Sequence, residues 1–310
     1  MTGASSEAED RKRLTDAVTL SGYRLGSLVA RMMPSPVAAV AASSLGFTAS
    51  FANLARRQMF QRHMRRVNPR ISTAELRLVT QQAFDSYAHY YMESFRLPTL
   101  SKRAVARGFS IDGWQRVLDG FAAGNGVILA LPHLGGWEWA GRWMTDQGHK
   151  LTVVVEPLDP PELFEWFVDL RTELGMTVVP LGPKAGAAVL KALKQNEAVC
   201  LLCDRDIDRT GIGVDFFGER TTLPAGPATL ALRTGAVLLP VGCYFTPRLS
   251  GHHAVVRPPI PTVRHGGGLR DDVNRVTQAL ARELEFLIRR SPEQWHMFQP
   301  NWPSDPGYYD

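Results

Sequence analysis

The chain has 310 residues, of which 45% are hydrophobic and 21% are charged. It is long enough to bury one large core or two modest ones, and its ordinary globular composition excludes a low-complexity chain. Lysine and arginine (35) exceed aspartate and glutamate (30), so the net charge of +5 suits an anionic partner without identifying it. Residues 1–14 mix acidic and basic side chains before any apolar run, so we expect no signal peptide and a cytoplasmic protein.

An uncharged stretch at residues 32–55 is followed by six arginines between residues 56 and 70, with no acidic residue among them. Two prolines and four serines make the uncharged stretch less apolar than a spanning helix. It predicts helices that lie on an anionic membrane surface or pack on the body, and an ordinary helical hairpin is the alternative. The arginine cluster contains only Phe60 as an aromatic residue and no nucleic-acid motif follows it, so we expect no nucleic acid as a partner.

Apolar residues recur at helical spacing through residues 71–97, and strands and helices alternate after that. Strands are predicted at 127–131, 151–155, 177–180, 198–203 and 236–241, and helices at 137–147, 161–174, 185–195, 227–234 and 269–290. This alternation predicts an α/β fold, a mostly parallel central sheet flanked by helices, with a helical N-terminal portion. We expect residues 1–100 to form that membrane-apposed portion of the same body, and residues 101–310 to form the α/β core.

The three cysteines, Cys200, Cys203 and Cys243, all lie in apolar runs that are typical of strands. Cys200 and Cys203 form a CxxC pair, but three residues apart on a strand they face opposite sides. Buried free thiols are therefore expected rather than a zinc or redox site.

His133 and Glu138 form the most informative motif of the chain. His133 follows a buried strand, and Gly135 and Gly136 allow a turn that places Glu138 in the first turn of the next helix. The pattern predicts an imidazole that acts as a general base and is oriented by the Glu138 carboxylate. Because the motif holds no Ser or Cys nucleophile, it favours activation of a bound alcohol or water. The alternative is a strand-end histidine that caps a helix beside an exposed glutamate.

Two more acidic residues follow predicted strands. Glu156 comes after 151–155 and Asp204 after 198–203, and the carboxyl ends of parallel strands share the edge of the sheet where ligands bind. We therefore expect both carboxylates on the same edge as His133. Alternatively, Glu156 caps a loop and Asp204 pairs with Arg205 or Arg209.

Four ordered stretches carry a resemblance to a known family: 133–138, which has the form HxxxxD/E, and 213–218, 222–240 and 292–295. They resemble the lysophospholipid-acyltransferase superfamily, in particular the branch with the lipid A lauroyl and myristoyl acyltransferases, over roughly residues 75–300. The weakly apolar helical start and the ending at 295–302 resemble the actinobacterial subfamily that acylates phosphatidylinositol mannosides.

The resemblance implies transfer of a fatty acyl group, typically palmitoyl, from acyl-CoA to a mannose 6-hydroxyl of a phosphatidylinositol mannoside. It implies no metal and no cofactor, since acyl-CoA is a co-substrate, and a peripheral location on the cytoplasmic face of the plasma membrane. An acyltransferase acting on lysophosphatidic acid, a thioesterase, and a non-catalytic protein that binds anions or membranes are the rival interpretations.

The same resemblance implies roles for individual residues. His133 is the base and Glu138 its orienting partner, while Arg171 together with Glu156 binds the donor or shapes the pocket. Asp204 and Arg205 occupy an acidic strand-end position of the family. The last pair, Phe216 and Phe217, is expected to line an acyl-chain groove. The alternatives are that the positive charge of Arg171 only offsets the dipole at a helix C-terminus and that the two phenylalanines belong to the core.

Overall fold

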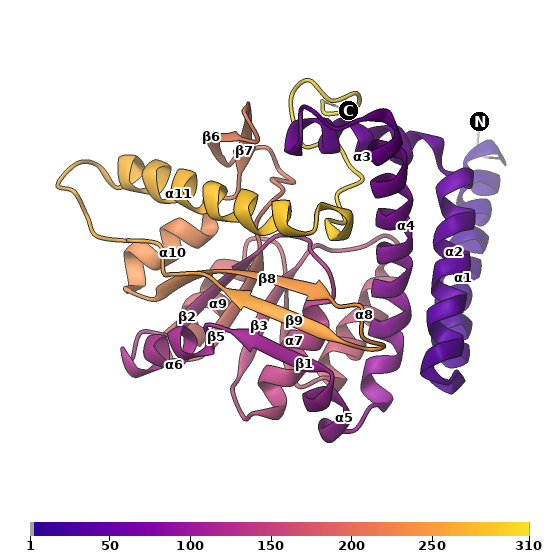
Figure 1. Ribbon diagram of the computed structural model, residues 1–310, viewed down its shortest axis with the longest axis horizontal. Coiled ribbons are helices and arrows are strands. Elements are labelled where there is room, and N and C mark those ends of the chain that lie inside the picture. The colour runs from indigo at the N-terminus through magenta and orange to yellow at the C-terminus, as the bar shows by residue number, and fades with distance from the viewer. Residues whose placement is uncertain (1–2, 310) are drawn as a thin grey trace.

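The structure, a computed structural model, describes residues 3–309 and begins with four helices (Figure 1). They are α1 (Gly3–Met32), α2 (Ser35–Ala52), α3 (Leu54–Val67) and α4 (Thr73–Arg96). Figure 1 shows α1 and α2 beside α4, on the side away from the sheet. Helix α4 begins with a capping box, in which the Ser72 and Glu75 side chains each accept the backbone N–H of the other residue. The predicted helical N-terminal portion is confirmed.

A seven-stranded sheet forms the centre of the described chain, in the order β1-β9-β8-β2-β5-β3-β4. Its strands are β1 (Phe109–Asp112), β2 (Val127–Leu131), β3 (Leu151–Val155), β4 (Met176–Pro180), β5 (Ala198–Leu202), β8 (Val237–Phe245) and β9 (His252–Val256). Neighbouring strands pair in parallel except β8 with β9, so the predicted mostly parallel sheet is confirmed.

Helices cover both faces of this sheet (Figure 1). They are α5 (Lys102–Arg107), α6 (Trp114–Ala122), α7 (Trp137–Asp146), α8 (Pro161–Glu173), α9 (Ala185–Lys194), α10 (Gly226–Thr234) and α11 (Leu269–Arg290), with short 3-10 turns η1 (Leu97–Thr99) and η2 (Pro292–Gln294). Ile128 and Ala130 of β2 belong to the core that α9, α10 and α11 cover, whereas Val127 and Leu129 belong to the core that α7 and α8 cover. Burial on both faces explains why β2 is apolar throughout.

The sequence does not predict four of the strands. β1 is short and half-buried, and β9 pairs antiparallel with β8, so neither resembles the buried parallel strands that the sequence pattern indicates. The other two, β6 (Ile212–Phe216) and β7 (Glu219–Leu223), form a separate antiparallel hairpin. Its turn contains Phe217 and Gly218, both with positive φ. The segment 213–218 is therefore part of one strand and the turn of a hairpin.

The N-terminal helices contribute to the same two cores as the α/β body. Phe60 and Phe84 are buried with residues of β2 and α11, and Ala42 and Phe95 are buried with residues of β3 and α8. Helix α2 is long and apolar enough, by length and composition alone, to cross a membrane, whereas the sequence pattern of residues 32–55 predicts an element less apolar than a spanning helix. Cys200, Cys203 and Cys243 are buried free thiols, as expected.

Candidate active site

A tight glycine turn carries the chain from β2 into α7 and places His133 at the carboxyl edge of the sheet. Gly135 has a φ of +56°, and a Cβ there would lie 2.3 Å from the carbonyl oxygen of Cys243. Glycine alone meets both constraints without a shift of the backbone. Glu138 lies in the first turn of α7, as the sequence predicts.

His133 is held by Asp204, which follows β5. The imidazole Nδ1 lies 2.6 Å from Asp204 Oδ1, and the backbone N–H of His133 donates to Asp204 Oδ2 at 3.0 Å. The side chain of His133 is 32% exposed, while that of Asp204 is completely buried. Strands β2 and β5 are parallel neighbours, so the residues that follow them meet at this edge.

The Asp204 carboxyl is ionised despite its burial. Burial by itself raises the pKa of Asp204, but the His133 imidazole and the hydrogen bonds from His133 and Trp295 outweigh it and hold the pKa below its usual value. A carboxylate only accepts hydrogen bonds, so Nδ1 of His133 carries the proton. In the neutral ring the other nitrogen, Nε2, then has a lone pair with which it can accept a proton.

The C-terminal segment supports this pair from behind. Trp295 donates its indole N–H to Asp204 Oδ2 at 2.7 Å, and Asn301 donates its amide to the Asp204 carbonyl at 3.0 Å. The backbone N–H of His296 donates to the His133 carbonyl at 2.8 Å. Three parts of the chain that are far apart in sequence therefore fix the position of one imidazole.

Glu138 does not orient His133 directly, and this part of the sequence prediction is wrong. One carboxylate oxygen of Glu138 accepts from the Tyr90 hydroxyl at 2.6 Å and from Arg171 at 3.0 Å, and the other oxygen is buried without a hydrogen bond. Burial raises the pKa of Glu138, and Arg171 and Tyr90 oppose that shift. Helix geometry explains the outcome, because Glu138 leaves α7 on the side that faces α4 and α8, which carry its two partners.

A cavity of about 630 Å³ opens in front of His133. Its walls combine aromatic and aliphatic side chains with a few charged groups. The apolar lining includes Tyr91, Trp137, Val154, Phe164, Phe167, Val189, Leu201, Leu230 and Met297. A volume of this size, with a mostly apolar wall and few polar groups, is typical of sites that bury small molecules or lipid chains.

Three charged residues singled out in the sequence, Glu156, Arg171 and Arg205, line the cavity. Glu156 forms an ion pair with Arg205, and Arg171 forms one with Glu138. Both Arg171 and Glu156 thus contribute to the wall of the cavity, and the Arg171 guanidinium lies over the Trp137 ring, 5.1 Å from the centroid. Each arginine reaches the cavity wall with its charge already balanced by a carboxylate.

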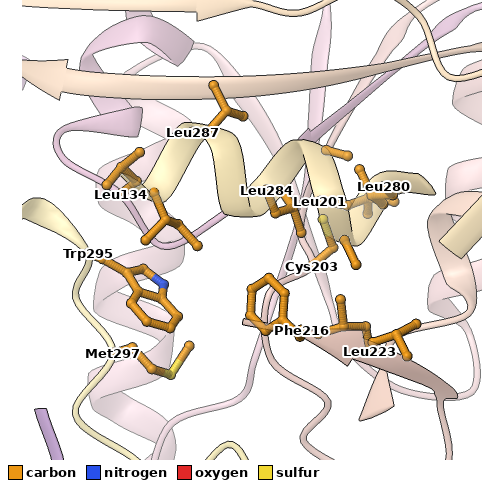
Figure 2. Close-up of a cluster of buried hydrophobic side chains, with 14 of the residues drawn as sticks. Leu134, Leu201, Cys203, Phe216, Leu223, Leu280, Leu284, Leu287, Trp295 and Met297 are labelled. Atoms are coloured by element: carbon orange, nitrogen blue, oxygen red, sulfur yellow. The ribbon is translucent and has the colours of Figure 1, made fainter. Parts of the chain in front are cut away.

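Phe216 and Phe217 do not line this cavity, so the structure supports the core alternative for both. Figure 2 shows Phe216 surrounded by buried side chains such as Cys203, Leu284 and Trp295. Its ring stacks on Trp302 with centroids 5.7 Å apart, and Phe217 packs on Trp295. The β6–β7 hairpin turns both rings inward beneath α11, so this apolar segment belongs to the core.

Sequence patterns assign no role to several residues of the site. Tyr90 and His296 line the cavity, and Trp295 orients Asp204. Trp295 belongs to the C-terminal stretch 292–295 that carries the resemblance, so its place in that stretch is a usable signal. His296 lies in the ending 295–302, which also carries a resemblance, whereas Tyr90 has no such signal because its neighbours in the sequence indicate only a helix. Among the side chains that the structure describes, no group of three His, Cys, Asp or Glu residues is arranged to hold a metal ion.

Comparisons with known proteins identify the family of the chain. Residues 10–304 match the bacterial lipid A biosynthesis acyltransferase family. The chain is 42% identical to a phosphatidylinositol mannoside acyltransferase of Mycobacterium tuberculosis (strain ATCC 25618 / H37Rv) over 228 residues, which are 72% of this chain and 70% of that protein. It is 36% identical to the protein of the same name from Mycolicibacterium smegmatis over 294 residues, covering 93% of this chain and 92% of the relative.

A more distant relative is the lipid A biosynthesis lauroyltransferase of Escherichia coli K12, which is 26% identical over 270 residues, 85% of this chain and 84% of that protein. The names of all three relatives describe acyl transfer. The matched region includes the whole sheet, the glycine turn, the cavity walls and the C-terminal segment behind Asp204. The chain therefore belongs to the bacterial lipid A biosynthesis acyltransferase family.

Proposed function

We propose that the protein transfers a long-chain acyl group, typically palmitoyl, from acyl-CoA to the 6-hydroxyl of a mannose on a phosphatidylinositol mannoside. The names of the two mycobacterial relatives support the acceptor class. The observation that carries the chemistry is the His133–Asp204 pair, which presents an imidazole with a proton-accepting Nε2 to a large apolar cavity.

The reaction needs one base and no covalent enzyme intermediate. Nε2 of His133 takes the proton of the acceptor hydroxyl as its oxygen attacks the thioester carbonyl carbon. Asp204 stabilises the imidazolium that forms, since its carboxylate is already ionised and 2.6 Å away. The C–S bond then breaks, and the imidazolium returns the proton to the CoA thiolate.

The cavity wall supports the choice of a long acyl chain. Its aromatic and aliphatic side chains remove hydrocarbon from water, and each buried CH₂ contributes about 0.8 kcal/mol. Affinity for the donor should therefore rise with chain length until the apolar wall is fully covered. Glu138 acts indirectly in this scheme, because it holds Arg171 and Tyr90 in the wall of the cavity.

Surface chemistry supports a peripheral location on an anionic membrane surface, which we propose to be the cytoplasmic face of the plasma membrane. Helix α2 and the start of α3 expose large apolar side chains, including Phe47, Phe51 and Leu54. Exposed arginines follow on α3, although Arg66 of the same cluster is used internally, in ion pairs with Glu219 and Asp305. An apolar face beside exposed cations is the pattern of helices that lie on anionic lipid.

The deciding experiment offers radiolabelled palmitoyl-CoA to the purified full chain with phosphatidylinositol mannoside, lysophosphatidic acid and a lipid A precursor in parallel. We expect label in the mannoside, and slow acyl-CoA hydrolysis that depends on His133 when no acceptor is present. Transfer to lysophosphatidic acid alone would refute the acceptor and leave the acyltransferase mechanism in place. Release of free fatty acid with every acceptor would identify a thioesterase, and no turnover would favour the non-catalytic alternative.

A further inference from the structure

A second histidine lines the cavity next to His133. His296 follows Trp295 in the C-terminal segment, and its backbone N–H is bonded to the His133 carbonyl. The two residues are therefore neighbours on adjoining segments of chain, as the bridge between Leu134 and Trp295 also shows. The His296 side chain is buried against α4, where Ser86 Oγ lies 2.9 Å from its Nε2.

The environment of Ser86 determines the tautomer of His296. Ser86 is itself buried, and within the described chain its hydroxyl has His296 Nε2 as its hydrogen-bond partner. If Nε2 carried the proton, the buried hydroxyl hydrogen would be left without an acceptor, at a cost of about 1–3 kcal/mol. Ser86 therefore donates to Nε2, and the proton of the neutral ring is on Nδ1.

Nδ1 of His296 is the ring atom that remains available to a ligand. It makes no hydrogen bond within the described chain. It is also not one of the polar side-chain atoms there that are buried without a partner, so it is accessible. Since His296 is otherwise buried and lines the cavity, the accessible side of the ring faces that space. The rings of Tyr87 and Tyr90 pack on His296 at centroid distances of 5.2 and 5.5 Å, so the orientation of the imidazole is fixed.

His296 also stays uncharged at neutral pH. Burial, followed by the nearby His133, lowers the pKa of His296 to about 3. With so low a pKa, the His296 imidazole is too weak a base to compete with His133 for the substrate proton, and because it is uncharged it does not repel the imidazolium that His133 becomes. It can act as a fixed hydrogen-bond donor through Nδ1.

Several other polar side chains of this wall are already engaged, and the Nε atoms of Arg171 and Arg205, which have no hydrogen-bond partner, are buried. Tyr90 donates to Glu138, the Tyr87 and Tyr91 hydroxyls bond to each other, and Arg171 and Arg205 are paired with carboxylates. His296, which lies next to the base His133, thus has a side-chain N–H without a hydrogen-bond partner in the described part of the chain. Acyl transfer needs such a donor, because negative charge develops on the carbonyl oxygen as the tetrahedral intermediate forms.

We propose that His296 is a second catalytic residue, whose Nδ1–H donates a hydrogen bond to the carbonyl oxygen of the acyl thioester as that oxygen becomes an oxyanion. This assignment rests on the acyl transfer proposed above. The C–O bond forms as the acceptor proton moves to His133, and the carbonyl π electrons move to the oxygen that His296 contacts. When the C–S bond breaks, those electrons return to the carbonyl and His133 protonates the thiolate, while His296 neither gains nor loses a proton.

The test compares His296→Phe, which keeps a ring and removes the donor, with His296→Asn, whose amide N–H takes the place of Nδ1–H. His149→Phe is the matched control, because His149 stacks on Phe121 at the opposite edge of the sheet. We expect His296→Phe to lower kcat about 10²- to 10³-fold with little change in KM, as loss of one oxyanion donor does. The kcat of His296→Asn should be at least about tenfold higher than that of His296→Phe. His149→Phe should behave as wild type.

Binding of two non-reacting donors separates this role from packing. A palmitoyl-CoA thioether mimics the ground state, and the trifluoromethyl ketone analogue presents an oxyanion-like oxygen. His296→Phe should bind the thioether as wild type does and lose the extra affinity for the ketone. Three results would each overturn the assignment. They are an equal loss of affinity for both ligands in His296→Phe, an equal loss of kcat in His296→Phe and His296→Asn, and a kcat of His296→Phe within about threefold of wild type. Wild-type protein that turns over no acyl-CoA would instead refute the proposed function, and this assignment with it.

Discussion

Replacing Asp204 by asparagine should reverse the tautomer of His133 while leaving the fold in place. Asp204 Oδ2 accepts two N–H donors, from His133 and Trp295, and Oδ1 faces Nδ1 of the imidazole. The asparagine oxygen will stay with the two donors, because turning the amide around leaves both unpaired at about 1–3 kcal/mol each. The amide NH₂ then points at Nδ1, which must become the acceptor.

The predicted loss follows from that reversal. With Nδ1 accepting, the ring proton moves to Nε2, which is the atom that has to receive the substrate proton. The same carboxylate-to-amide change in a Ser-His-Asp triad costs about 10⁴ in kcat with the geometry intact, and we expect a loss of about 10³- to 10⁴-fold here. Glu138→Gln should cost less, because Glu138 contacts Tyr90 and Arg171 and makes no hydrogen bond to His133.

The assay is single-turnover transfer from radiolabelled palmitoyl-CoA, with circular dichroism and thermal unfolding to check the fold. The two variants together test which carboxylate serves the base. If Asp204→Asn kept activity within about tenfold of wild type while Glu138→Gln abolished it, Glu138 would be the orienting group and the reasoning from the hydrogen bonds would be wrong.

Three further outcomes are expected. His133→Ala should lower the transfer rate by about 10²- to 10⁴-fold and leave the circular dichroism spectrum unchanged, and activity near wild type would rule out His133 as the base. The protein should sediment with anionic liposomes at low salt and be released by high salt, because each cation near the surface contributes about 1 kcal/mol to membrane binding and salt screens that attraction. Equal binding to neutral liposomes would contradict the role of residues 56–70. Stability should fall as pH drops from 6.5 towards 4, since burial lowers the pKa of His63 to about 4 and that of His296 to about 3, and the unfolded chain binds the protons first. Each histidine contributes a slope of about 1.4 kcal/mol per pH unit in that window, and urea unfolding at constant ionic strength that shows no slope would refute their burial as neutral rings.

Local sequence patterns predict most of the fold. The runs at 127–131 and 151–155 and the helix at 269–290 have the predicted bounds in the structure, because a strand buried on both faces and a long amphipathic helix each leave a strong pattern. The β6–β7 hairpin leaves a weaker one. Its strands alternate buried with more exposed positions and carry Asp215 and Arg220 on the outside, so they lack a continuous apolar run.

The site is predictable in outline. Because parallel strands end on one edge, the sequence correctly places His133, Glu156 and Asp204 at the same edge of the sheet, and the glycine turn is also expected. The pairing among the charged groups is not predictable in this way. The sequence pattern pairs Glu138 with His133, whereas in the structure Glu138 contacts Arg171 and it is Asp204 that contacts His133.

The order of most strands and helices, the edge of the sheet that carries the chemistry, and the histidine at the end of β2 all follow from the amino-acid sequence without a structure. Hydrophobic periodicity, glycine conformation and strand direction are local properties that can be read along the chain. Three-dimensional packing was needed to show that Asp204 holds His133, that Trp295 supports Asp204, and that Phe216 belongs to the core. The first two of these contacts join residues 71 and 91 positions apart in the sequence. Whether residues so far apart come into contact depends on how the sheet and the C-terminal segment pack together.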